Sequence, residues 1–274
     1  MRRVSQLTVG RVTPGELGQL RVLLDTDPVQ NVYLRSELRL LGAAAPWYAV
    51  SDGTTMRAAV MGGALTVPWI PDPDDAPHLA AAIRAAPPVH LMVGPRAAVH
   101  ALHTHLSPPR AAHEVRDHQP VMVVDRERLQ VLPPAPLRPS TRADVERLAQ
   151  AAAAMHAEEM GTDTRPPDPS AWRARMTQLV DRSWSWCWVD RGELVFKAEL
   201  SAWTPEVVQV QGVFTAPAHR GRGVATAAMV ALSSRLLAAA PLVTLYVNSH
   251  NDTAIRMYRR VGFEPVGEFA TVMY

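Results

Sequence analysis

Residues 219–226 read HRGRGVAT, between an apolar strand pattern at residues 207–215 and a long helical pattern that begins at Gly223. Arg220, Gly223 and Ala225 fit the spacing R-x-x-G-x-G/A. Glycine lets backbone N–H groups converge on a phosphate without a Cβ atom in the way. The helix that follows points the positive end of its dipole at the same anion. The stretch therefore indicates an anion-binding turn, although taken alone it also fits an ordinary glycine turn before a helix.

A second pattern follows the strand-like stretch TLYVNS. Asn251, Ala254 and Tyr258 form N-x-x-A-x-x-x-Y, and Gly262 comes four residues later. On a helix the three motif positions share one face, with Asn251 where an N-cap belongs. A purely structural interpretation makes Tyr258 a core residue and Gly262 a C-cap glycine. Two such motifs in this order, each at a strand-to-helix junction, are much rarer by chance than either alone, so we favour a functional interpretation.

These residues resemble motifs A and B of the GNAT superfamily, and the likeness covers about residues 137–274. The resemblance implies an acetyl-CoA-dependent N-acetyltransferase, with acetyl-CoA as cosubstrate and no metal. Such an enzyme moves the acetyl group directly to a primary amine, here of an unidentified small molecule or peptide. The stretch from Lys197 to Tyr274 also resembles bacterial two-domain members in which a degenerate N-terminal GNAT-like domain precedes the active one.

The resemblance implies roles for individual residues. The turn would hold the CoA pyrophosphate through its amides and two arginines, a set that comprises Arg220, Gly221, Arg222, Gly223, Val224, Ala225 and Thr226. The backbone of Val213 and Thr215, with Phe214 between them, would bond the pantetheine arm and the acetyl carbonyl from a strand splayed away from TLYVNS. Asn251 would contact the pantetheine chain. Tyr258 would be the general acid that protonates the departing thiolate.

The general base is left open by these motifs. An amine that attacks a thioester must lose a proton. Many relatives place a glutamate on the strand before the pyrophosphate turn, but this chain has Gln209 and Gln211 there, and glutamine accepts no proton. We expect Glu158 or Glu159 to be the base, since relatives line the acceptor pocket with that helical region. The alternatives are a water chain or one of the side chains of Glu199, Glu206, His156 and His219.

Length and element order predict two domains. The 274 residues suit two domains of roughly 130 residues each, and the predicted order of strands and helices occurs twice. We expect an α/β chain of the mixed α+β kind: two tandem GNAT-like domains, each a mixed, mostly antiparallel sheet flanked by helices. The expected domains are residues 1–125 and 137–274, joined by a charged, Pro-Pro-containing linker at 126–136.

The first domain is not expected to bind CoA. Where its pyrophosphate turn should fall, residues 71–77 read PDPDDAP. Three aspartates there would repel a phosphate, and three prolines remove amide donors. We expect this domain to pack against the second domain or to shape the acceptor site.

Composition narrows the function further. A net charge of +2 with no basic run gives no support for nucleic-acid binding. The one cysteine, Cys187, excludes an intrachain disulfide and a cysteine-based zinc site, and its alternating surroundings predict a buried, inert thiol. The N-terminal MRRVSQLTVG lacks a signal-peptide stretch, and no apolar run approaches about 18 residues, so we expect a cytoplasmic protein without membrane contact. The oligomeric state is open, a homodimer included.

One competing function belongs to another class. A non-catalytic acyl-CoA-binding or regulatory protein of the same fold would keep the cofactor turn and lose the acceptor chemistry. Gln209 favours this alternative, and Tyr258 opposes it.

Overall fold

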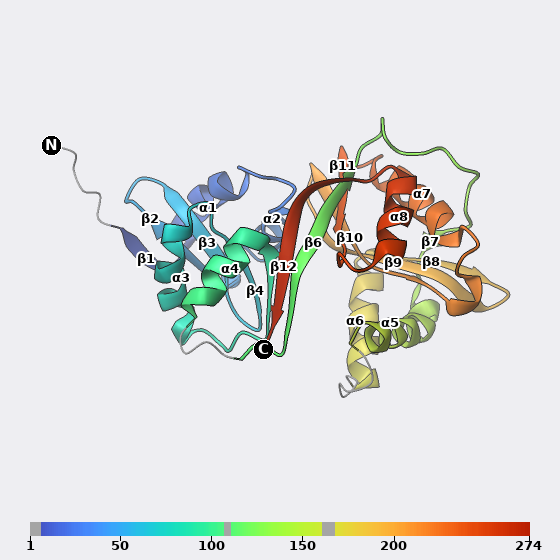
Figure 1. The fold of residues 1–274 in the computed structure, drawn as a ribbon, viewed down its shortest axis with the longest axis horizontal. Helices are drawn as coiled ribbons and strands as arrows, with labels where there is room; N and C mark the ends of the chain where they lie inside the picture. The colour runs from blue at the N-terminus through green and yellow to red at the C-terminus, as the bar shows by residue number, and fades with distance from the viewer. Residues whose placement is uncertain (1–6, 107–110, 161–167) are drawn as a thin grey trace. The chain divides into compact units, whose positions relative to one another are not determined.

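The computed structural model describes residues 7–106, 111–160 and 168–274 (Figure 1). The first six residues of the N-terminal stretch considered above lie outside these ranges. The chain forms two compact units. The first comprises Met1–Met122, Tyr246–Asn251 and Pro265–Tyr274, and the second comprises Val123–Leu245 and Asp252–Glu264.

The first unit is a mixed sheet with helices on both faces. Its strands lie in the order β1-β2-β3-β4-β5-β12-β6, antiparallel from β1 to β4, parallel between β4 and β5, and antiparallel between β5 and β12. In chain order the elements are β1 (Thr8–Arg11), α1 (Leu17–Leu24), α2 (Val32–Leu41), β2 (Trp47–Ser51), β3 (Met56–Met61), β4 (Leu65–Trp69), α3 (Ala76–Ala82), β5 (Leu91–Pro95), α4 (Arg96–His105), β6 (Glu114–Val124) and β12 (Glu264–Met273).

Alternation along the strands divides the core of this unit between the two faces of the sheet. The neighbours Ala59 and Val60 of β3 are both fully buried, yet they belong to different clusters. Val60 packs with residues of α3 and α4, whereas Ala59 packs with residues of α1 and α2. Helices α1 and α2 are separated by a segment that contains Asp27 and Pro28, because the residue before a proline disfavours the helical conformation.

The second unit contains a sheet with strand order β11-β10-β9-β8-β7. Its elements are β7 (Arg138–Pro139), α5 (Val145–Met160), α6 (Pro169–Asp181), β8 (Ser185–Asp190), β9 (Glu193–Trp203), β10 (Val207–Thr215), α7 (Val224–Leu236), β11 (Leu242–Tyr246) and α8 (Asp252–Val261). Helices α5 and α6 pack against each other and share an apolar cluster with Cys187 of β8 (Figure 1). Cys187 is fully buried, and burial raises the pKa of its thiol, as expected of an inert cysteine.

The mixed α/β class predicted from the sequence is confirmed, but the last strand does not join the expected sheet. Residues 265–274 were expected in the second domain, whereas β12 pairs antiparallel with β5 of the first unit, Ala270 lying opposite Gly94. The hydroxyl of Thr271 donates to Gln119 Oε1 at 2.6 Å, which ties β12 to β6. The apolar alternation of this strand predicts a buried face, but it does not determine which sheet the strand joins.

The expected linker also differs from the structure, because residues 123–137 belong to the second unit. The amide of Gln130 donates to Val261 O at 3.0 Å, and Arg126 Nε donates to Leu237 O at 2.9 Å. Ala135 and Leu137 are buried. Residues 126–130 are therefore tied to the second unit by hydrogen bonds, whereas Val131 and Leu132 are exposed. Within the described residues, no helix is both long enough and apolar enough to span a membrane.

Candidate active site

The expected splay of two strands is present in the second unit. Strand β10 pairs in parallel with β11 over Val207–Gln209, opposite Leu242–Thr244. Within the described residues this pairing ends at Gln209, although β10 continues to Thr215. The second half of β10 therefore has one side that β11 does not use for hydrogen bonding.

On its other side, β10 carries a bulge. Its register with β9 shifts between Gln211 and Phe214, so that one extra residue of β10 is accommodated there. Gly212 lies in the bulge with a φ of 59°, a left-handed conformation that favours glycine. The bulge includes Val213, one of the two residues whose backbone the resemblance places on the pantetheine arm.

The glycine turn has the geometry of an open anion cradle. Gly221 and Gly223 have φ values of 72° and 76°, and a Cβ added at either would meet no atom within 4 Å. Both glycines and Arg222 are exposed. Helix α7 begins at Val224, directly after Gly223, and the first amides of a helix have no partner within it. These residues therefore fit a pyrophosphate, which needs converging N–H donors and close approach of the backbone.

Arg220 fastens this turn to its surroundings. Its Nε donates to Thr215 O at 2.9 Å, and its Nη2 lies 2.9 Å from each carboxylate oxygen of Glu158. The guanidinium also lies 5.4 Å from the ring centroid of Phe214. The arginine thus links the end of β10 to the end of α5, and it engages both oxygens of one of the two carboxylates expected to be the base.

Tyr258 is buried on α8, with its ring edge-on to Phe263 at a centroid distance of 5.8 Å. Burial raises the pKa of Tyr258 well above its ordinary value of 10, and the charge of Glu159 raises it further. The phenol therefore keeps its proton through the neutral range and can act as an acid. The two glutamates therefore differ: the charge of Glu159 acts on Tyr258, whereas Glu158 is paired with Arg220. Gly262 has a φ of 113°, and its amide donates to Tyr258 O at 3.2 Å, which confirms the expected C-cap glycine.

Gln209 is one of the two glutamines, with Gln211, at the place where the resemblance implies a glutamate. Gln209 is buried, and its Oε1 accepts a hydrogen bond from Ser201 Oγ at 2.8 Å. Glu199, left open from the sequence, is also buried and lies 2.5 Å from Lys197 Nζ. This ion pair was not anticipated. The available signal was the only lysine of the chain, in a strand pattern, with a carboxylate two residues later on the same face.

The remaining sequence candidates lie as follows. Asn251 directly precedes α8 in a segment of the first unit, and its amide donates to Asn248 O at 2.9 Å. The ring of His156 packs 5.6 Å from that of Trp172. His219 ends the short 3-10 turn Pro217–His219 beside the glycine turn. Glu206 is exposed between β9 and β10. None of the described histidines, cysteines, aspartates and glutamates form a group of three or more arranged to hold a metal ion.

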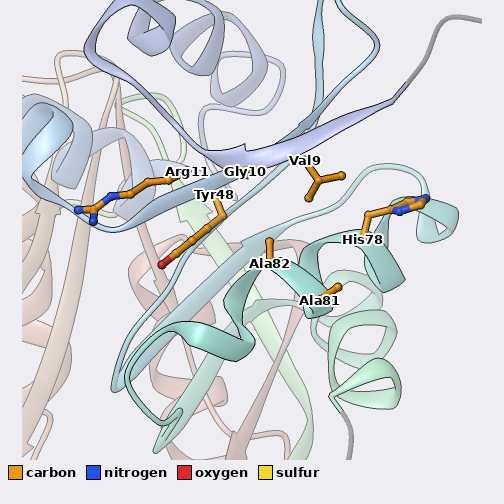
Figure 2. Close-up of a pocket in the computed structure, with 7 residues that line it drawn as sticks. All are labelled: Val9, Gly10, Arg11, Tyr48, His78, Ala81 and Ala82. Carbon is orange, nitrogen blue, oxygen red and sulfur yellow. The ribbon is translucent and has the colours of Figure 1, made fainter.

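A separate hollow opens in the first unit among β1, β2 and α3 (Figure 2). Its lining consists of Val9, Gly10, Arg11, Tyr48, His78, Ala81 and Ala82. Figure 2 shows Arg11 and His78 at opposite ends of it, and the seven residues include no carboxylate or thiol. The candidate active site is formed by the splayed strand of the second unit and its glycine turn, which carries the first sequence motif.

Comparison with known proteins agrees with this placement. Residues 148–263 match the model of the acetyltransferase (GNAT) family, and residues 45–148 match a domain of unknown function, DUF4081. No curated protein matches the chain.

Several solved structures share the fold over nearly the full length. An acetyltransferase from the GNAT family of Colwellia psychrerythraea is 12% identical, with 97% of this chain and 99% of that chain covered and a TM-score of 0.64. A tandem GNAT protein from the clavulanic acid biosynthesis pathway is 14% identical, with 98% of each chain covered and a TM-score of 0.59. A GCN5-related N-acetyltransferase from Sphaerobacter thermophilus is 15% identical, with 98% and 95% covered and a TM-score of 0.58.

At these identities the likeness shows the fold, which is that of tandem GNAT proteins, and the N-terminal match is consistent with a degenerate first domain. The second unit also supplies the glycine turn, Ala254 and Tyr258 of the second motif, and the splayed, bulged strand β10. The chain therefore carries, over residues 148–263, a domain of the acetyltransferase (GNAT) family.

Proposed function

We propose that the protein is an acetyl-CoA-dependent N-acetyltransferase that moves an acetyl group directly to a primary amine. Membership of residues 148–263 in the acetyltransferase family supports acyl-CoA-dependent acetyl transfer in general. The observation that carries the proposal is the open turn with Gly221 and Gly223 in left-handed conformations, directly before α7 and next to the free side of β10.

In this proposal the turn residues 221–226 hold the pyrophosphate through backbone amides, and Arg222 adds charge at the exposed edge. Acetyl-CoA supplies an acyl group already activated as a thioester. The backbone of Val213 and Thr215, on the part of β10 that has left β11, orients the acyl end of the cosubstrate. Arg220 acts indirectly, because its guanidinium is engaged by Thr215 and Glu158 and keeps the turn in place.

We assign Tyr258 as the general acid. The phenol is protonated at neutral pH, as it would be at the ordinary tyrosine pKa of 10, and can give that proton to a departing thiolate. The rise in its pKa by burial and by Glu159 makes it a weaker donor and does not itself support the role. Of the two carboxylates expected as the base, we favour Glu159, because Glu158 is bound through both oxygens to Arg220.

A matched pair of variants tests that choice. Glu159→Gln should lower kcat and remove the acidic limb of the pH profile, since the proton acceptor is lost. Glu158→Gln should mainly raise the KM for acetyl-CoA, because it loosens Arg220 and the turn. If Glu159→Gln keeps both kcat and pH profile, another group takes the proton.

The function itself is tested by thiol release when the protein is mixed with acetyl-CoA and a panel of primary amines. Release that depends on one amine class, together with CoA binding measured by calorimetry, would support the proposal. Gly223→Val should weaken CoA binding by at least about tenfold, since it adds a side chain at a left-handed position in the cradle. Gly192→Ala, at another left-handed glycine in the β8–β9 turn, is the matched control and should leave CoA affinity unchanged.

The second candidate is a non-catalytic acyl-CoA-binding protein, which the buried, hydrogen-bonded Gln209 favours. The same assay separates the two. Tight CoA binding with no thiol release for any amine would support this candidate and exclude the enzyme.

We also propose that the first unit does not bind CoA at residues 71–77. Two of the aspartates there are ion-paired with Arg57: Asp72 at 3.1 Å and the buried Asp75 at 3.1 Å. The carboxylates of this stretch already bind Arg57. They would present negative charge, and not hydrogen-bond donors, to a phosphate. Calorimetry should then give one CoA per chain for the wild-type protein, and no second site that keeps its affinity in Gly223→Val.

A further inference from the structure

The second unit contains a buried ion pair on strand β9. Lys197, the only lysine of the chain, is fully buried, and Glu199 is 3% exposed. Both lie on β9, two residues apart and therefore on one face, with Nζ and Oε1 separated by 2.5 Å. Taking two charges out of water is costly, and an ion pair in such a place is seldom more stabilising than apolar side chains of similar size. Fold stability alone therefore does not account for this pair.

The pair is bonded to the bulge of β10. Lys197 Nζ also donates to the carbonyl oxygen of Gly212 at 3.0 Å. Glu199 occupies the space beside that glycine, since a Cβ on Gly212 would lie 2.8 Å from Glu199 Cδ. The two charged side chains thus hold one peptide group of the bulge by a charge-assisted hydrogen bond and fill the volume next to it.

The contact between Lys197 and Gly212 lies directly beside the backbone that is proposed to meet the thioester. In the register, Glu199 lies opposite Gln211 and Lys197 lies opposite Phe214, so the pair flanks the bulge on both sides. Val213 follows Gly212 directly, and Thr215 ends the strand. A displaced Gly212 would therefore change the direction of the backbone groups that the thioester meets.

We propose that Lys197 and Glu199 are positioning residues that hold the β10 bulge at Gly212 and thereby orient the backbone of Val213 and Thr215 toward the acyl end of the cosubstrate. The orienting role rests on the proposed acyl transfer. The holding of the bulge by the ion pair does not depend on that function. Neither residue is assigned contact with the reacting atoms.

The test replaces both charges together, because removing Lys197 alone would leave Glu199 buried and unpaired. The double variant Lys197→Met with Glu199→Leu keeps the buried volume apolar and is expected to fold, which thermal unfolding checks. Amide hydrogen exchange at residues 210–216, followed in the protein without ligand, should become faster by about tenfold. Ser201→Ala is the matched control: it removes a β9–β10 hydrogen bond to Gln209, outside the bulge, and should leave exchange at 210–216 unchanged.

Steady-state kinetics provides the second measurement. In the folded double variant kcat should fall by at least about tenfold, since small misplacement of orienting groups is costly, while CoA affinity at the glycine turn stays within about twofold. A folded double variant with unchanged exchange overturns the proposal whatever its turnover, and one with faster exchange but unchanged kcat overturns the orienting role. If the wild-type protein releases no thiol with any amine, the proposed function fails, and the exchange result alone decides whether the pair holds the bulge.

Discussion

At the scale of single residues, the surroundings of Tyr258 and Gly262 in the second unit determine what each position can do. The phenol of Tyr258 lies in an apolar environment near the charge of Glu159, and both effects oppose its ionisation. Gly262, four residues later at the end of the same helix, lies against the backbone of Arg128. Electrostatics therefore determines the protonation of Tyr258, whereas the lack of space determines that residue 262 is a glycine.

For Tyr258→Phe we expect kcat to fall by about a hundredfold, with the KM for acetyl-CoA little changed, since only the proton donor is removed. The raised pKa of Tyr258 means that the wild-type enzyme keeps its acid form up to and beyond the ordinary tyrosine pKa of 10. Loss of this proton should therefore not limit wild-type kcat below that pH. A Phe variant with wild-type turnover at every pH would show that the acid is another group.

Gly262→Ala should destabilise the protein by ~3 kcal/mol in urea unfolding. Gly262 has a φ of 113°, and a Cβ there would fall onto the backbone carbonyl of Arg128. Gly192→Ala is the control, since Gly192 has a φ of 85° but no atom within 4 Å of the added Cβ, so only the strain of about 1 kcal/mol applies. Equal costs for the two variants would mean that residues 126–130 are not packed against α8 in solution.

At the scale of elements, the start of α5 depends on one buried carboxylate. Asp144 accepts from the backbone N and hydroxyl of Thr141, each at 2.8 Å, in a capping box. It also accepts two hydrogen bonds from the guanidinium of Arg138 on β7, at 2.8 and 3.0 Å. The carboxylate therefore joins a strand, a cap and a helix, and its contacts with Arg138 and Thr141 hold its pKa well below the usual range.

Asp144→Asn should cost ~2 kcal/mol of stability at pH 7, measured by urea unfolding. Because the folded pKa of Asp144 is depressed, its contribution is fully present above the unfolded pKa of about 3.9 and is lost as the pH falls through the folded pKa. The difference between wild type and variant should accordingly shrink once the pH drops below about 4. Asp181→Asn, which breaks the exposed pair with Arg142, should change stability too little to measure. A constant difference from pH 7 to pH 2 would contradict the linkage.

At the scale of the whole molecule, the chain ends in the unit in which it begins. Strand β12 completes the sheet of the first unit beside β5, and it contributes the buried Ala270 and Val272 to the cluster under α3 and α4. The hydroxyl of Tyr274 lies 2.7 Å from His103 Nδ1 of α4. The first unit is therefore incomplete without the last ten residues of the chain.

We expect a fragment of residues 1–122 to be unstable or to aggregate, since β5 would have an unpaired edge and the core would lose its last strand. A fragment in which residues 264–274 follow residue 122 through a flexible linker should recover cooperative thermal unfolding, followed by circular dichroism. Cooperative unfolding of residues 1–122 alone, at the same midpoint as the linked fragment, would show that β12 is dispensable to the unit.

Much of this could be predicted from the local sequence. Hydrophobic period, turn residues and caps predicted the strands and helices of both halves, since each depends on neighbours within a few residues. The glycine turn and Tyr258 were found for the same reason: backbone conformation and helix face are local properties. The engagement of Glu158 by Arg220, 62 residues away, could not be found in that way.

The sequence by itself determined the type of fold, the family motifs and the position of the glycine turn, because these follow from short-range periodicity and from the backbone freedom of glycine. Only the tertiary structure decided which sheet takes the last strand, how residues 125–130 pack, and which carboxylates are already paired. Those outcomes depend on contacts between segments far apart in the chain, such as β12 with β5 or Lys197 with Gly212, and alternation along one strand does not specify its partner.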